Sequence, residues 1–238
     1  MGGGPAVGGA TATGGSGGSE YCGVGPTRNG TATWYQLATP LVHCSYPTHS
    51  LPQYYGAMND ADYGTAEVCG ACVEVSAGGR SVVVQIVDEC PFEGNEAWCW
   101  AGSNHIDLSQ AAFQQLADLN VGVVDISWRY VPCEVNGNLQ YAFKDGSSIY
   151  WTGILIRNSA VPIVRVEVTN ASGYWKSLSR TDYNYWLDES GFGEGPYSIR
   201  VTDANGSTAV EAGVPSLTGS ATGEPTFHEM SVQLPGCN

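Results

Sequence analysis

Apolar side chains in the first half of the chain follow the two-residue period of half-buried β-strands. Residues 71–76, 81–89 and 123–131 alternate or run apolar in this way and predict three strands. Between the first two lies AGGR, residues 77–80, which predicts a hairpin turn. Residues 108–117 have helical spacing instead, with one apolar face formed by Leu108, Ala112, Phe113 and Leu116.

The second half predicts β-structure only, in strands about ten residues apart with turn residues between them. These strands are expected at residues 139–144, 151–158, 163–169, 198–204 and 231–235. Many short strands at this spacing are typical of a small β-sandwich.

The composition of the chain changes near residue 135. Residues 20–135 hold seven of the eight cysteines and carry 13 acidic against 3 basic residues, whereas residues 136–238 carry 10 against 6. Asn136-Gly137 is also a turn signal. We therefore expect a flexible glycine-rich N-terminus over residues 1–19, a first domain over 20–135 and a second over 136–238.

The net negative charge of the chain argues against polyanionic partners. With 9 basic and 23 acidic residues the net charge is −14, which repels nucleic acid and anionic membrane surfaces. Charged residues are only 13% of the chain, while it carries 13 Tyr and 7 Trp. This surface favours a neutral, polar ligand with flat faces on which aromatic rings can stack, such as a polysaccharide.

The eight cysteines indicate disulfides formed in an oxidising compartment, and hence a secreted, extracellular protein. The sequence shows no apolar run near the roughly 18 residues of a membrane span, and its first residues lack the basic and apolar regions of a signal peptide. Cys69 and Cys72 have zinc-knuckle spacing, with His43, His49 and His105 available. Because no second such pair exists, disulfides are favoured, His105 is expected to be a structural hydrogen-bonding residue, and no metal or cofactor is expected.

Asp107 is the first candidate for chemistry. It lies between Ile106 and Leu108, and a carboxyl group held among apolar neighbours tends to keep the proton that a general acid needs. Glycosidases usually require a second carboxylate on the other side of the scissile bond. Asp is also a favoured N-cap residue, so Asp107 can equally cap a helix that begins at Leu108.

Several segments, taken together and in order, resemble expansins over roughly residues 20–238. In the first half they are GTATWY (30–35), CGACVEV (69–75), VVQIVDECPFEG (83–94), HIDLSQAAF (105–113) and ISWRYVPC (126–133). In the second half they are KDGSSIYWTGILIRN (144–158) and RTDYNYWLDESGFGEGPYSIRVTD (180–203). The resemblance implies a mainly β protein, with a six-stranded double-psi β-barrel followed by an immunoglobulin-like β-sandwich that binds cellulose. It also implies loosening of plant-type cell walls without net hydrolysis.

The resemblance places a functional groove on the barrel. This barrel fold is shared with family-45 endoglucanases, lytic transglycosylases and barwin-type proteins. Asp107 matches the general acid of the endoglucanases, but Gln36 stands where their base would be. An amide cannot take a proton from water near neutral pH, so Asp107 and Gln36 lack the general base that an inverting mechanism requires. The wall-loosening groove implied by the resemblance is instead formed by Asp107, Asp88 and Thr33, with Tyr35 and Glu93 beside them.

The resemblance also assigns the polysaccharide-binding surface of the second domain. Tyr150, Trp151 and Tyr183 match a linear aromatic platform, with Lys144 beside it to bind sugar hydroxyls. Adjacent residues of a regular strand point to opposite faces, so Tyr150 and Trp151 can share a face only where the strand is twisted or bulged. The remaining aromatic residues considered are expected in the core: Trp175, Trp186, Phe192 and Tyr197.

Four disulfides follow from the resemblance and the order of the cysteines. Cys72–Cys133 and Cys44–Cys69 match bridges in the family. Cys90 and Cys99 are close in sequence and flank a groove loop, so a local bridge closes that loop at small entropic cost. Cys22–Cys237 then remains and would join the two domains. Eight cysteines allow about 105 connectivities, so this full set is a demanding hypothesis.

The leading hypothesis is a secreted, monomeric, non-hydrolytic protein that loosens walls containing cellulose and other plant glucans, with no nucleic-acid or membrane partner. One alternative is a weak endoglucanase of the same barrel that uses Glu93 or Asp88 as base. A second alternative is a carbohydrate-binding protein whose barrel is inert.

Overall fold

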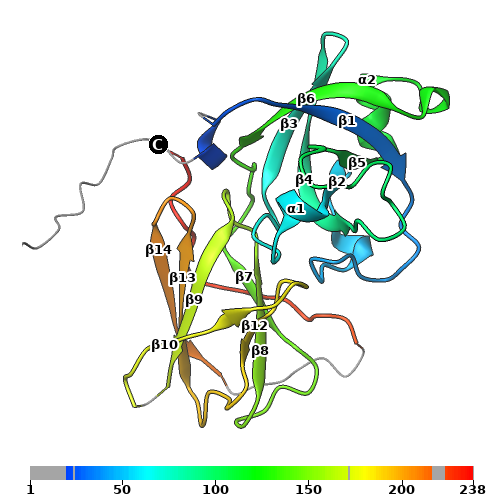
Figure 1. Cartoon of the computed structure of the whole chain (residues 1–238). Helices are drawn as coiled ribbons and strands as arrows, with labels where there is room; N and C mark the ends of the chain where they lie inside the picture. Colours follow the sequence, from blue (N-terminus) through cyan, green and yellow to red (C-terminus); the bar gives the residue numbers. More distant parts are fainter. Residues whose placement is uncertain (1–19, 24, 171, 216–222, 238) are drawn as a thin grey trace, which may run out of the picture.

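The chain forms a closed six-stranded barrel and two further β-sheets (Figure 1). The computed structural model describes residues 20–23, 25–170, 172–215 and 223–237. The predicted flexible start, residues 1–19, lies outside the described residues. The protein is therefore mainly β, with the barrel that the resemblance implied.

The barrel takes its strands out of sequence order, as β1-β5-β2-β4-β3-β6. Pairs β1–β5 and β2–β4 are parallel, and the other neighbours are antiparallel. Its elements are η1 (Glu20–Cys22), β1 (Arg28–Tyr35), η2 (Thr48–Ser50), β2 (Tyr55–Asn59), α1 (Asp60–Tyr63), β3 (Cys72–Ala77), β4 (Arg80–Cys90), β5 (Ile106–Ser109), α2 (Gln110–Leu116), η3 (Leu119–Val121) and β6 (Val124–Val131).

The three strands predicted in this half are present as β3, β4 and β6. The predicted hairpin joins β3 to β4 through Gly78 (φ 56°) and Gly79 (φ 78°). Two consecutive residues with positive φ give the turn whose twist matches paired strands, and glycine adopts that conformation without strain. The AGGR sequence therefore fixes this hairpin.

The predicted helix begins later than expected. Leu108 and Ser109 still belong to β5, and α2 starts at Gln110. Ser109 is the N-cap, because its Oγ accepts a hydrogen bond from the Ala112 backbone N–H at 3.2 Å. Asp107 does not cap the helix, so that reading of Asp107 is wrong. No helix in the described ranges combines the length and apolar character needed to cross a bilayer.

The rest of the chain builds two antiparallel sheets, one with the order β10-β9-β13-β14 and one with β11-β12-β8-β7-β15. Side chains from both sheets, among them Ile154 and Ile199, form one buried cluster between them. The strands are β7 (Gln140–Phe143), β8 (Thr152–Arg157), β9 (Ile163–Thr169), β10 (Lys176–Ser177), β11 (Ser179–Arg180), β12 (Trp186–Asp188), β13 (Tyr197–Asp203), β14 (Thr208–Val214) and β15 (His228–Glu229).

Residues 231–235 do not form the predicted strand. Side chains take two of their backbone donors: Ser231 N–H donates to Glu211 Oε2 at 2.8 Å, and Leu234 N–H donates to the side chain of the adjacent Gln233. Pro235 has no N–H to donate. The short strand β15, just before this segment, pairs with β7 instead.

The barrel and the sheets are joined by specific contacts of one loop. Tyr63 Oη donates to the Asp182 carbonyl at 2.8 Å, and Ser45 Oγ donates to the Tyr183 carbonyl at 2.7 Å. Arg180 Nη1 donates to the Ala66 carbonyl at 2.9 Å. The loop that carries Tyr183 is therefore held directly by the barrel.

The structure contains four disulfides, and they are the four pairs that the sequence hypothesis named: Cys22–Cys237, Cys44–Cys69, Cys72–Cys133 and Cys90–Cys99. Among the described residues there is no free cysteine. Cys22–Cys237 spans 215 positions of sequence, whereas Cys90–Cys99 spans 9. A cross-link over a longer loop restricts the unfolded chain more strongly.

We expect the double variant Cys22→Ser/Cys237→Ser to lose about 5 kcal/mol of unfolding free energy, against about 3 kcal/mol for Cys90→Ser/Cys99→Ser. The two bridges also differ in burial, because Cys90 and Cys99 are buried whereas Cys22 and Cys237 are partly exposed. Urea unfolding of both variants and the parent measures the two losses. A loss well below about 3 kcal/mol in Cys22→Ser/Cys237→Ser would contradict the chain-entropy account.

Candidate functional site

The predicted groove residues of the barrel lie in one row across four neighbouring strands. Thr33 of β1 is in register with Asp107 of β5, Asp107 with Ala57 of β2, and Ala57 with Asp88 of β4. Side chains in register on adjacent strands project from the same face of the sheet. Ala57, between the two carboxyl groups, is buried and packs against Cys90, Cys99 and Tyr35.

The Asp107 carboxylate has polar partners. Thr33 Oγ1 donates a hydrogen bond to its Oδ1, and His105 Nε2 lies 3.2 Å from the same oxygen. Ile106 and Leu108 are fully buried, and as the next residues on the strand they point to the opposite face. The apolar neighbours in the sequence are therefore not neighbours of the carboxyl group, and the expectation of an apolar setting is wrong.

His105 is buried completely and links the threonines of β1 to Asp107. Its Nδ1 lies 2.8 Å from Thr31 Oγ1, and its Nε2 lies 3.1 Å from Thr33 Oγ1. The expectation that His105 is a structural hydrogen-bonding residue agrees with these contacts. Trp98, half-exposed, stacks on the imidazole with ring centroids 5.7 Å apart, and sequence reasoning had missed this residue.

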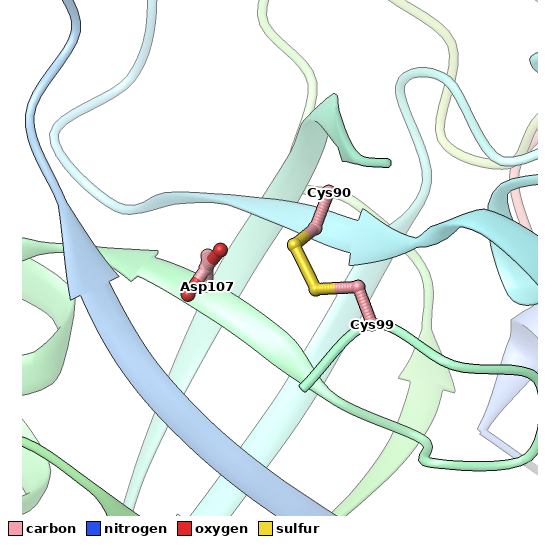
Figure 2. A group of neighbouring side chains, drawn as sticks. All are labelled: Cys90, Cys99 and Asp107. Carbon is pink, nitrogen blue, oxygen red and sulfur yellow. A yellow bond between two sulfur atoms is a disulfide. The ribbon is translucent and has the colours of Figure 1, made fainter. Parts of the chain in front are cut away.

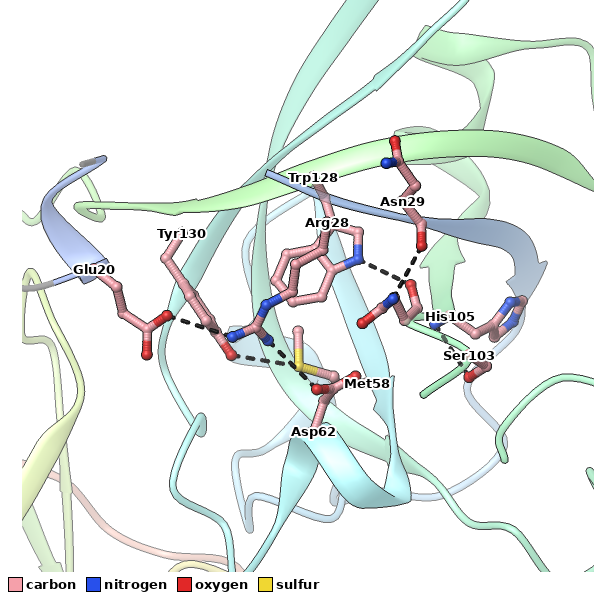
Figure 3. A network of polar contacts seen from close by, with 10 residues as sticks. Glu20, Arg28, Asn29, Met58, Asp62, Ser103, His105, Trp128 and Tyr130 are labelled. Carbon is pink, nitrogen blue, oxygen red and sulfur yellow. Dashed lines mark hydrogen bonds and ion pairs between the residues drawn. The ribbon is translucent and has the colours of Figure 1, made fainter. Parts of the chain in front are cut away.

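The segment that carries His105 is fixed to the barrel wall (Figure 3). Trp128 Nε1 donates to the Asn104 carbonyl at 2.9 Å, and Asn104 Nδ2 donates to the Asn29 carbonyl at 3.0 Å. The backbone of β1 can approach Asn104 this closely only because residue 30 is glycine. A Cβ atom at that position would lie 2.2 Å from the Asn104 carbonyl oxygen. The sequence thus positions the imidazole through a backbone contact that only glycine permits.

The Cys90–Cys99 disulfide lies beside Asp107 (Figure 2). A carboxylate oxygen and the two sulfur atoms are within 4.8 Å of one another, a distance compatible with metal ligands. Both sulfurs are bonded to each other, so neither supplies the thiolate that a metal binds. Cys69 and Cys72 also belong to disulfides, which removes the zinc-knuckle alternative.

Asp88 lies at the other end of the row and is mostly buried. Burial raises its pKa above the ordinary value, and the His43 backbone N–H, which donates to its Oδ1 at 2.7 Å, opposes that rise. Burial together with Asp88 also raises the pKa of Tyr35, so Tyr35 stays a neutral phenol beside the carboxyl group. Asp88 and Tyr35 thus form a half-buried polar pair at this end of the row.

We expect Asp88→Asn to stabilise the fold at pH 7 but not at pH 3. A carboxyl group with a raised folded-state pKa contributes stability below its unfolded value of about 3.8 and loses it as the pH rises. The amide cannot ionise and keeps an oxygen for the His43 N–H. Melting temperatures of variant and parent should diverge as the pH increases from 3 to 7. A constant difference across this range would contradict the assigned role of burial.

Two other residues considered from the sequence lie outside this row. Glu93 is exposed on the loop between Cys90 and Cys99, and no contact that the structure describes joins it to Asp107 or Asp88. Gln36 is exposed just after the end of β1. Glu93 and Gln36 therefore both lie in solvent-exposed segments next to the barrel strands.

Tyr150 lies in a turn and not in a strand, so its side chain and that of Trp151 need not point to opposite faces of a sheet. Ser148 and Trp151 form an isolated bridge, with Ser148 N–H donating to the Trp151 carbonyl at 2.6 Å. Tyr150, at the tip of this turn, is 77% exposed, and Trp151 is half-buried immediately before β8. The objection drawn from regular strand geometry does not apply here.

Tyr183 lies in a second turn, between Thr181 and Tyr185, and is half-buried. Asn184 in this turn has φ 70°, a left-handed conformation that Asn tolerates. Lys144 Nζ lies 5.5 Å from the centre of the Tyr183 ring and 5.0 Å from that of Tyr185. Lys144 and Tyr183 are therefore neighbours, as predicted.

One predicted core residue is exposed. Trp186, Phe192 and Tyr197 are buried, but Trp175 is 36% exposed and its neighbour Tyr174 is 84% exposed. Trp175 lies just before β10, and the guanidinium of Arg200 covers its ring with the carbon 4.3 Å from the ring centre. The prediction of a core position for Trp175 is wrong.

Comparison with known proteins places this arrangement in a family. A family model described as lytic transglycolase matches residues 27–128. Expansin-like protein 5 of Dictyostelium discoideum is 31% identical over 200 residues, which cover 81% of this chain and 81% of that protein. The chain belongs to the expansin family. This membership supports the prediction that the protein is not a hydrolase.

Other expansins extend the comparison. Expansin-like protein 1 of the same organism is 37% identical over 64% of this chain, and the match spans 53% of that protein. The crystal structure of the apo expansin of Clavibacter michiganensis is 30% identical, covers 87% of this chain and 98% of its own, and has a TM-score of 0.75. A mutant of that protein in complex with cellohexaose matches with a TM-score of 0.74.

Proposed function

We propose that this expansin is a secreted, monomeric protein that loosens plant cell walls without hydrolysing them. In this proposal residues 20–135 form the loosening barrel, and residues 136–238 form an immunoglobulin-like sandwich that anchors the protein on cellulose and related glucans. The row of Thr33, Asp107 and Asp88 beside the stacked pair Trp98–His105 carries the proposal.

The groove is suited to exchanging hydrogen bonds with a glucan. Asp107 is partly exposed, with 21% of its side chain accessible, and it accepts from Thr33 on one side. A charged acceptor forms hydrogen bonds roughly twice as strong as a neutral one. A sugar hydroxyl that donates to Asp107 gives up its bond to a neighbouring chain, and the contact between two glucans is weakened.

A specific observation keeps weak hydrolysis as the second candidate. Asp107 and Asp88 are two strands apart on one face, which puts their Cα atoms roughly 10 Å apart at the usual strand spacing. Inverting glycosidases hold their carboxyl groups about 6.5–9.5 Å apart. Against this role, Asp88 is mostly buried and already accepts the His43 N–H, which leaves it poorly placed to activate water.

The anchor is the aromatic group formed by Tyr150, Trp151 and Tyr183. Aromatic rings stack on the apolar faces of glucose units, with about 1 kcal/mol for each ring. The complex of the Clavibacter expansin with cellohexaose supports a β-linked glucan as the ligand class. The barrel contacts of the Tyr183 loop support a platform that is aligned with the groove.

The decisive experiment measures creep of heat-inactivated plant wall strips under load, together with release of reducing ends from amorphous cellulose. We expect sustained extension and no steady release of reducing ends. Steady release that Asp107→Asn abolishes would establish the endoglucanase alternative. Binding to cellulose without any creep would establish a carbohydrate-binding protein with an inert barrel.

A further inference from the structure

A second aromatic cleft adjoins the proposed platform at Tyr150. It has a volume of about 710 Å³, within the range of sites for small ligands. Its aromatic lining comes from Tyr150, Tyr174, Trp175 and Phe192. Trp151 and Tyr183 do not line it, so the cleft and the platform share only Tyr150 among these rings.

Trp175 is held in place for stacking. The Arg200 guanidinium covers its ring, and Arg200 is fixed in turn by two hydrogen bonds of 2.7 Å to the Glu167 carboxylate. An aromatic side chain that is held from one side and still 36% exposed loses little conformational freedom on binding. Such a ring is preorganised for a flat ligand.

The one cation that lines the cleft among the described residues, Lys176, is paired with a carboxylate. Lys176 Nζ lies 2.6 Å from Asp188 Oδ1 and also donates to Ser190 Oγ at 2.6 Å. Arg200 is neutralised by Glu167, and Glu194 adds a further carboxylate to the lining. No cation that lines the cleft among the described residues is left for an anionic polymer, whereas hydroxyl groups find donors and acceptors here.

The backbone keeps Tyr150 at the junction of the two surfaces. Gly193 N–H donates to the Ile149 carbonyl at 3.0 Å, which ties the Tyr150 turn to the loop of the cleft. Gly191 is required at this contact, because a Cβ atom there would lie 2.3 Å from the Ile149 oxygen. The Tyr150 turn and the loop that lines the cleft are therefore held against each other.

We propose that this cleft binds a single, neutral β-glucan chain that has left the crystal surface. A concave site admits one free chain but not the flat face of a crystal, which only the platform of Tyr150, Trp151 and Tyr183 can meet. The proposal rests on the proposed polysaccharide-binding function. It assigns Tyr174 and Trp175 to soluble chains and leaves crystalline cellulose to the platform.

The test follows the indole N–H signals of the tryptophans by NMR while cellohexaose is added to the full-length protein. The Trp175 signal is assigned by its absence in Trp175→Phe. We expect it to shift and saturate in the parent and also in the double variant Trp151→Ala/Tyr183→Ala, whose platform is disabled. We expect Tyr174→Ala, at an 84% exposed position, to weaken the affinity that this saturation reports roughly fivefold and to leave binding to crystalline cellulose unchanged.

Two results would overturn the assignment. One is a Trp175 signal that does not move at cellohexaose concentrations that saturate the Trp151 signal. The other is a Trp175 shift that disappears in the platform double variant, since the cleft would then have no site of its own. Failure of the platform proposal gives a different result: the double variant would bind crystalline cellulose like the parent while the Trp175 signal still responds.

Discussion

Replacing Tyr150, Trp151 and Tyr183 together by Ala is expected to lower the affinity for crystalline cellulose roughly 100-fold. Each ring contributes about 1 kcal/mol of stacking, and about 1.4 kcal/mol corresponds to a factor of ten. Tyr150 is 77% exposed in a turn, so its loss leaves the core intact. Pull-down of the full-length protein with microcrystalline cellulose measures the change.

The matched control for this variant is Trp100→Ala. Trp100 is an equally large aromatic residue, 49% exposed, in the barrel loop that follows Cys99. We expect this variant to bind crystalline cellulose like the parent. Because stacking is not ionic, binding of the parent should change little between low and moderate salt. A triple variant that still binds like the parent would show that the platform has been assigned to the wrong side chains.

Periodicity predicted seven of the fifteen strands that the structure describes: β3, β4, β6, β7, β8, β9 and β13. It placed the start of α2 too early, because the apolar Leu108 fits the helical pattern that follows it. In the structure Leu108 is a buried residue of strand β5. Ser109, the true N-cap, is the local signal that would have corrected the boundary. Residues 231–235 alternate like a strand, but side chains, one of them far away in the sequence, take two of their backbone hydrogen bonds.

The candidate site was not readable from periodicity alone. The barrel orders its strands β1-β5-β2-β4, so Thr33, Asp107 and Asp88 meet only through pairings between distant segments. The resemblance to expansins supplied these three residues. Trp175 was misjudged for a similar reason: the cation that covers its ring, Arg200, comes from β13 and has no sequence signal beside the tryptophan.

Replacing Asp107 by Asn is expected to reduce wall creep by roughly 10- to 100-fold while the protein remains folded. A hydrogen bond to a charged group contributes about 1.5–3 kcal/mol, which corresponds to this range. Asn has nearly the same size and keeps an oxygen that can accept from Thr33 Oγ1, so the row across β1 and β5 is preserved. What the variant loses is the negative charge offered to a sugar hydroxyl.

Asp125→Asn is the control that separates local chemistry from net charge. Asp125 is an exposed carboxylate on β6 of the same barrel, and its replacement changes the total charge by the same amount. We expect normal creep from this variant and normal cellulose binding from both. Because the platform is untouched in Asp107→Asn, a protein that binds but does not loosen separates the groove from the anchor. Full creep by Asp107→Asn would instead assign loosening to the aromatic surfaces of the second half of the chain.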